Sequence, residues 1–295
     1  MSVESPATVQ GTKPLPAAGF TLGYGSNGFA DHTLEGVLHV LESSGYGALA
    51  LTLGHPHLDP FADDALDMAA QLRRRLDELG WRVVVETGSR YLLDPFIKHR
   101  PTLVDNNAEA RLRFLRRAID IAAVLRADCV SLWSGVLPGG VTAEEGWLRL
   151  LERMPGVLEY AEHSGVMLGF EPEPGMVVET VADALRLYAE LGNPRAFGIT
   201  VDLGHCVAVE PYGVVEAVRA AGSLLVNVQV DDMMPGVHEH LELGHGQLDL
   251  TAALRALHEM DYRGVAAMEL PRHSHDAPGL ASRSMTKLHR AWEAR

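Results

Sequence analysis

Four oxygen-bearing side chains follow short apolar runs in the second half of the 295-residue chain. Glu171 ends VMLGFE, Asp202 ends AFGITVD, Gln229 stands in LLVNVQV and Glu269 follows VAAM. Carboxylate oxygens with one amide oxygen form a donor set that suits Mn²⁺, Mg²⁺ or Co²⁺ better than a thiol-rich site would. A single carboxylate at such a place is often only a cap, but four in succession predict a metal site. Gln229 is its weakest member, because an amide there commonly just makes hydrogen bonds.

Other polar or aromatic groups end the earlier apolar runs. His55 and His57 follow the second run, Glu86 closes the third, and Trp133 closes the fourth before Ser134-Gly135. Each could line a substrate pocket beside the acids. For Trp133 the alternative is ordinary packing, and for the histidines it is an exposed loop.

One dense basic patch and one histidine-rich segment complete the candidates. Residues 94–101, DPFIKHRP, contain Lys98 and could be a solvated loop or a clamp for a substrate carboxylate or phosphate. His205 lies three residues after Asp202, and His240 belongs to HEHLELGHG at 238–246, which we interpret as a loop after the seventh run. His-x-His can bind zinc, but in isolation it predicts exposed side chains. Beside a carboxylate site, one of these histidines could face the substrate.

Such residues can meet only if the runs are parallel strands that end on one face. Eight short β-rich runs alternate with segments of helical period, which predicts a single (β/α)8 TIM barrel over residues 19–295. Residues 1–18 are expected to form a loose tail. The expected strands are Phe20–Tyr24, Ala48–Leu53, Arg82–Thr87, Cys129–Trp133, Val166–Glu171, Ala196–Asp202, Leu224–Val230 and Val265–Leu270. The expected helices are Leu66–Leu79, Glu109–Leu125, Asp183–Leu191, Leu248–Met260 and Leu280–Trp292.

Composition and missing motifs exclude several other classes. The glycines from Gly23 to Gly28 lack the spacing of a dinucleotide-binding loop, and no G-x-S-x-G, P-loop or C-x-x-C motif occurs. A net charge of −14 argues against nucleic-acid binding, because phosphate contacts need a broadly basic surface. The apolar runs are too short to span a membrane. Two cysteines, no disulfide framework and no signal-like start lead us to expect a cytoplasmic protein.

The strand-end residues resemble those of the xylose isomerase-like TIM barrels, the sugar phosphate isomerase/epimerase superfamily. The resemblance covers most of the chain after the tail and is strongest over residues 166–270. VDLGH at 201–205 resembles D-x-G-H, Asn227–Asp231 resembles the H-x-x-D strand, and LGHGQLD at 243–249 resembles the G-x-G-x-(I/L)-D turn. DYRG at 261–264 with Glu269 resembles the GY-x-G…E ending.

The resemblance implies a ligand set and a class of activity. Glu171, Asp202, Gln229 and Glu269 would bind one divalent metal. The family more often has His in place of Gln229, although hydroxypyruvate-isomerase-like members use Gln. That departure favours Mn²⁺ or Mg²⁺ over Zn²⁺. His205 would contact the substrate or the metal. The substrate would be a sugar or cyclitol, anionic if the patch at Lys98 is a clamp, and a homo-oligomer, dimer or tetramer, is implied.

Three functions fit these residues. The first is a metal-dependent sugar isomerase or epimerase of carbohydrate metabolism, in which Glu171 and Glu269 exchange a carbon-bound proton through a metal-stabilised enediolate, with His205 or His240 moving protons between oxygens. The second is a lyase resembling inosose or dehydroshikimate dehydratases, with His55, His57 or His240 as the acid. The third is a non-catalytic sugar-binding barrel, although such a rim needs no convergence of acids.

Overall fold

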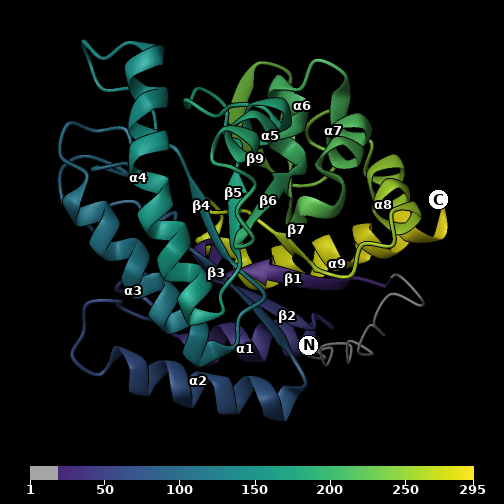
Figure 1. Ribbon diagram of the computed structural model, residues 1–295. Helices are drawn as coiled ribbons and strands as arrows, with labels where there is room; N and C mark the ends of the chain where they lie inside the picture. The colour runs from purple at the N-terminus through teal and green to yellow at the C-terminus, as the bar shows by residue number, and fades with distance from the viewer. Residues whose placement is uncertain (1–18) are drawn as a thin grey trace, which may run out of the picture.

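A computed structural model describes residues 19–295 of the protein, and the tail expected over residues 1–18 lies outside them. Eight parallel strands close into a barrel in the order β1-β10-β7-β6-β5-β4-β3-β2. Helices surround these strands on the outside (Figure 1). The barrel strands are β1 (Thr21–Gly25), β2 (Ala48–Thr52), β3 (Arg82–Glu86), β4 (Val130–Trp133), β5 (Leu168–Glu171), β6 (Phe197–Asp202), β7 (Leu225–Val230) and β10 (Val265–Met268).

The connections are mostly helical, as parallel strands require. The α-helices are α1 (Leu34–Ser43), α2 (Ala65–Leu79), α3 (Glu109–Leu125), α4 (Ala143–Ser164), α5 (Val181–Glu190), α6 (Leu203–Val209), α7 (Gly213–Ala221), α8 (Leu250–Glu259) and α9 (Ala277–Glu293). Short 3-10 turns are η1 (Ser26–Phe29), η2 (Gly222–Leu224) and η3 (Ser274–Asp276). No helix within residues 19–295 is long and apolar enough to cross a membrane.

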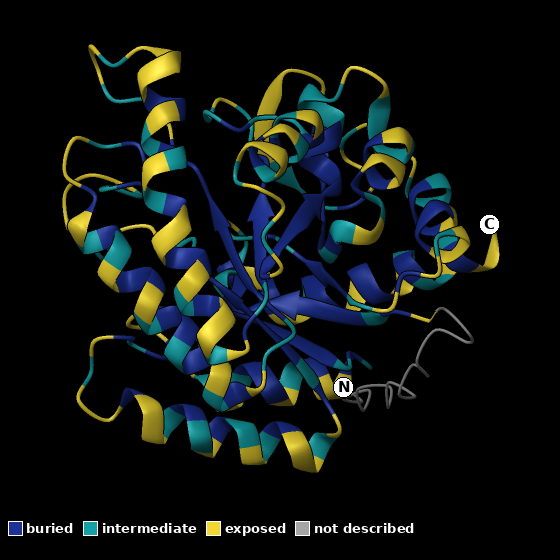
Figure 2. Ribbon diagram, in the orientation of Figure 1, coloured by how far each residue is buried: buried dark blue, intermediate teal, exposed yellow. Residues whose placement is uncertain are grey.

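Local sequence signals explain where several helices begin and end. Thr142 and Glu145 form a reciprocal capping box at the start of α4. α2 ends at Gly80, whose φ of 69° lies in the left-handed region that glycine adopts without strain. The helices present buried faces to the strands and exposed faces to solvent, and the strands themselves are almost wholly buried (Figure 2). This is the burial that the amphipathic period predicts.

The predicted barrel and all of its strands are confirmed to within two residues at each end. The five predicted helices are also present. The interpretation of residues 238–246 as a plain loop is wrong for its first part, because β8 (Asp232–Met234) and β9 (Val237–Leu241) form an antiparallel hairpin there. A two-residue turn through Pro235 and Gly236 joins them, and Gly236 has the positive φ of 73° that such a turn requires.

The side chains that fill the barrel interior form an apolar layer followed by a polar one. Small apolar side chains, among them Val84, Cys129 and Ala267, form a buried cluster. Two residues further along the same strands or just beyond them come Glu86, Ser131 and Glu269. Because side chains of a strand alternate between its faces, residues two apart point the same way. The interior therefore changes from apolar to polar toward the carboxyl ends of the strands.

Candidate metal and substrate site

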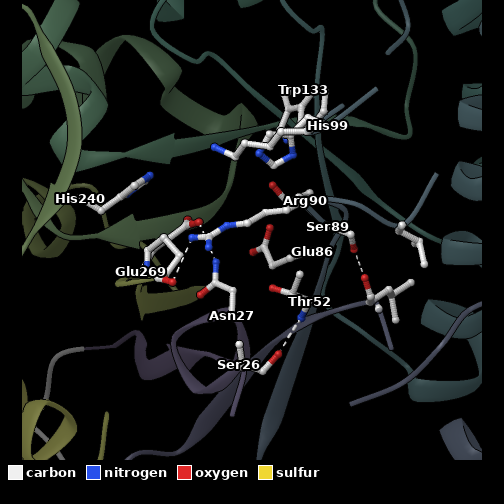
Figure 3. A pocket seen from close by; sticks show the side chains of 18 of the residues that line it. Ser26, Asn27, Thr52, Glu86, Ser89, Arg90, His99, Trp133, His240 and Glu269 are labelled. Carbon is white, nitrogen blue, oxygen red and sulfur yellow. Dashed lines mark hydrogen bonds between the residues drawn. The ribbon is translucent and has the colours of Figure 1, made fainter. Parts of the chain in front are cut away.

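A cavity of about 480 Å³ opens at the carboxyl ends of the barrel strands. Active sites of this fold lie at that end. Figure 3 shows Asn27, Glu86, Arg90 and Glu269 converging on it. The residues predicted from the sequence that line it are His55, His57, Glu86, Lys98, Trp133, Glu171, His205, Gln229, His240 and Glu269. Asp202 is the exception, and borders a smaller cavity behind His205.

Glu171 and Glu269 are each held by a neutral donor. The Asn27 side chain donates from Nδ2 to Glu269 Oε1 at 2.9 Å, across 242 residues of sequence. The Ser131 hydroxyl donates to Glu171 Oε2 at 3.3 Å, and the other oxygen of Glu171 lies 3.5 Å from His205 Nδ1. Each carboxylate therefore has a fixed orientation.

Several buried polar atoms in this region have no hydrogen-bond partner within residues 19–295. They include Asp202 Oδ2, Gln229 Oε1, Glu269 Oε2 and His205 Nε2. Leaving such atoms unpaired costs about 1–3 kcal/mol each. The donor atoms of Glu171, Asp202 and His205 lie within 4.8 Å of one another. Unpaired oxygens beside such a group fit a divalent cation. Glu269 belongs to none of the close groups of donor atoms found within residues 19–295.

The strand register shows how the barrel brings the predicted ligands together. Asp202 is the direct partner of Gln229 between β6 and β7. Gln229 is opposite Ala267 of β10, so Glu269 stands two residues further along its strand than Gln229 does. Glu171, Asp202, Gln229 and Glu269 therefore share one end of the barrel, as predicted, but do not lie at the same height along its axis. Tilted, staggered strands, which closure of a barrel requires, accommodate this offset.

Burial and mutual repulsion raise the pKa values of the carboxyl groups in the cavity. Burial and the neighbouring Glu269 raise the pKa of Glu171 well above its usual value. Burial raises the pKa of Glu269 to about 8 and those of Glu86 and Glu173 to about 7. These carboxyl groups can hold or release a proton near neutral pH, which proton-transfer chemistry requires. Burial lowers the pKa of His205 to about 4, so its imidazole is neutral.

The hairpin β8–β9 adds histidines that sequence reasoning placed only in part. His238 and His240 both line the cavity, with their ring centroids 4.9 and 5.5 Å from that of His205. These three histidines are a second group of donor atoms that could hold a metal ion. The buried Asp231 carboxylate lies 2.5 Å from His240 Nδ1 and fixes that ring. The spacing of 238 and 240 is itself the signal, because it puts both side chains on one face of a strand.

The basic side chains of residues 94–101 lie in different surroundings. Lys98 lines the cavity, whereas the Arg100 guanidinium pairs with Asp105 at 2.5 Å. Arg90 and Arg272 line the cavity instead, and sequence reasoning missed both. Trp133, only 6% exposed, both packs and lines the cavity.

The histidines after β2 lie in different surroundings. His55 is largely exposed and pairs with Asp59, whereas His57 is buried with Nε2 3.2 Å from the His32 carbonyl oxygen.

The geometry defines the structural class of this protein. It is a closed (β/α)8 barrel with a cluster of buried acids at the carboxyl ends of its strands. Residues 38–291 match the family described as xylose isomerase-like TIM barrel, and the chain belongs to that family.

Two of the similar proteins are named as sugar epimerases. Fructoselysine 3-epimerase of Shigella flexneri is 28% identical over 184 residues, which are 61% of this chain and 66% of that protein. The structure of an L-ribulose 3-epimerase is similar with a TM-score of 0.75 and 18% identity, covering 93% and 95% of the two chains. A structure of the IolI protein with a bound zinc atom has a TM-score of 0.70 and 17% identity, covering 92% and 99%.

Proposed function

We propose that the protein is a divalent-metal-dependent isomerase or epimerase of a ketose or a related sugar derivative. The observation that carries the proposal is the pair of oriented carboxylates, Glu171 and Glu269, which line one cavity with Gln229. The Asp202 carboxylate lies within 4.8 Å of Glu171, and both Asp202 and Gln229 have an unpaired side-chain oxygen. The epimerases among the similar proteins support a sugar substrate. Family membership supports the same class.

The metal would be held by Glu171, Asp202, Gln229 and Glu269, with oxygen donors that favour Mn²⁺ or Mg²⁺. A divalent cation bound there supplies charge that polarises a carbonyl and makes the neighbouring C–H more acidic. The IolI structure has a bound zinc atom, which supports metal binding by this chain without fixing which metal it is.

The chain's own residues would move the proton. Asn27 holds one oxygen of Glu269, and Ser131 holds one oxygen of Glu171. The geometry leaves the remaining oxygens to bind or to exchange a proton with a substrate carbon. One carboxylate would remove the proton and the other would return it, which inverts or relocates a stereocentre. Neutral His205 would shuttle a proton between substrate oxygens, because its Nε2 is unpartnered.

A lyase is the second candidate, favoured by acids beyond the two that proton exchange needs. Burial raises the pKa of Glu173 and of Glu86 to about 7, so either can supply a proton to a departing hydroxyl at neutral pH. Elimination would turn a cyclitol or keto acid into an enone. Ultraviolet absorbance that grows with time would favour the lyase, whereas deuterium uptake without it would favour the isomerase.

The test joins metal content to proton exchange. Wild type and Glu269→Gln would be dialysed against Mn²⁺, Mg²⁺ or Zn²⁺, and bound metal measured by mass spectrometry. Loaded wild type would then be incubated with a panel of ketoses in deuterated water. We expect near-stoichiometric metal and deuterium at the substrate carbon for wild type, and a large loss of both for the variant.

The matched control is Glu159→Gln, which makes the same change on the exposed side of α4. It should bind metal like wild type. Equal metal loading in wild type and Glu269→Gln, with no deuterium uptake from any ketose, would contradict the proposal. That result would favour a sugar-binding barrel without catalysis.

A further inference from the structure

Three cationic side chains line the same cavity that holds the acids. Arg90 and Lys98 belong to the long connection between β3 and α3, and Arg272 follows β10. All three are exposed at the cavity mouth. The chain carries 39 Asp and Glu against 25 Lys and Arg, so a gathering of cations at one opening runs against its overall charge.

The positive charges of these three side chains are weakly compensated or not compensated within the described residues. Lys98 has no ion pair within residues 19–295, whereas the other lysine of that range, Lys287, pairs with Glu242 at 2.9 Å. Arg90 donates from Nη2 to the Pro271 carbonyl oxygen at 3.0 Å, and that neutral acceptor leaves its charge uncompensated. Arg272 pairs with Glu239 at 2.7 Å in a half-exposed contact, which water weakens.

The placement of Arg90 brings positive charge across the opening. In Figure 3 its side chain passes above Glu86 toward the Asn27 and Glu269 side. The hydrogen bond to Pro271, two residues beyond Glu269, fixes that direction. It places the Arg90 guanidinium beside the residue that precedes Arg272. Burial lowers the pKa of Lys98, and repulsion from the guanidinium groups of Arg90 and Arg272 lowers it further. Glu173 acts in the opposite direction and raises the pKa of Lys98, but it forms no ion pair with it.

We infer that Arg90, Lys98 and Arg272 bind a terminal phosphate or carboxylate of the substrate, at the end remote from the carbon that exchanges its proton. The inference rests on the proposed function for the reacting end, which Glu171 and Glu269 would hold deeper in the cavity. A volume of about 480 Å³ lies within the 300–1,000 Å³ usual for small-ligand sites. Guanidinium forks and an ammonium are the groups that bind such anions. A neutral sugar would leave Arg90 and Lys98 without an anionic partner.

The experiment measures binding without catalysis. Metal is stripped with a chelator, which is then dialysed away, so that no bound cation can attract the probe. Titration calorimetry is run with glycerol 3-phosphate, glycerate and neutral glycerol on wild type, Lys98→Gln and Arg90→Gln. We expect at least one anion to bind more than tenfold tighter than glycerol, and each variant to weaken that anion about tenfold, as loss of a charged hydrogen bond does. The better anion distinguishes phosphate from carboxylate.

Arg74→Gln is the control, because it removes the same charge from the exposed outside of α2. It should bind the anion within twofold of wild type, and circular dichroism should show all variants folded. Anions that bind no tighter than glycerol, or variants equal to wild type, would overturn the inference. This binding experiment involves neither metal nor turnover. Its outcome therefore does not depend on the outcome of the metal and deuterium test of the proposed function.

Discussion

Replacing Arg111 by Met should destabilise the protein and release the segment that carries Lys98. Arg111 lies on α3 and is 3% exposed. Its guanidinium donates to three carbonyl oxygens, those of Thr87, His99 and Pro101, at 3.2, 3.0 and 3.0 Å. It also lies 4.5 Å from the centre of the Trp133 ring. One side chain thus attaches much of the connection between β3 and α3 to the barrel.

The magnitude follows from those contacts. A hydrogen bond from a charged donor contributes about 1.5–3 kcal/mol, and three would give more than 4 kcal/mol. Removing the charge also removes the cost of burying it, which offsets part of the loss. We therefore expect unfolding to become easier by roughly 3 kcal/mol. Methionine keeps the aliphatic contacts, so the effect reports the polar head.

Urea unfolding would measure the change, and trypsin would measure the release. Cleavage after Arg90 and Lys98 should accelerate, since both lie in the segment that Arg111 holds. Arg113→Met is the control. Arg113 is exposed on the same helix, and within residues 19–295 its one ion pair is with Glu109 one turn away, which contributes about 0.5 kcal/mol. A loss below 1 kcal/mol for Arg111→Met, with unchanged cleavage, would refute the reasoning.

Two further predictions concern a glycine and an ion pair. In Gly204→Ala the new Cβ would lie 1.9 Å from Asp231 Oδ1, so we expect a loss of about 2–4 kcal/mol in thermal unfolding and displacement of His240. Gly156→Ala, which meets nothing within 4 Å in α4, should be neutral or slightly stabilising, and equal effects would contradict the steric argument. Hydrogen bonds from Arg283 lower the pKa of Glu242 to about 2. A depressed carboxyl pKa stabilises the fold above about pH 4.5, and this contribution fades as pH falls toward 2. Glu242→Gln should therefore cost about 1–2 kcal/mol at pH 7, after allowance for screening at half-exposed Arg283, and much less at pH 3. A cost independent of pH would show that the pair does not stabilise the fold.

The sequence was sufficient for the barrel and for most of the polar rim. Each strand is a short apolar run, and the residue type changes sharply at its end, as at Glu86, Glu171 and Asp202. In a parallel barrel those ends share one face whatever the detailed packing. Helix bounds such as Glu109–Leu125 also followed from period alone. α4 was not predicted, because Pro155 and Gly156 interrupt its helical pattern although the helix continues through them.

Only the tertiary structure decided which groups act on one another. Asn27 holds Glu269 from the far end of the chain, and Asp231 orients His240 through the hairpin that sequence reasoning took for a loop. The separation of Lys98, which faces the cavity, from Arg100, which pairs with Asp105, depends on the path of the connection after β3. Periodicity and strand ends are local properties, so the sequence determines them directly. Contacts across the barrel depend on strand stagger and on loop paths, which many weak interactions fix together, and no single segment encodes them.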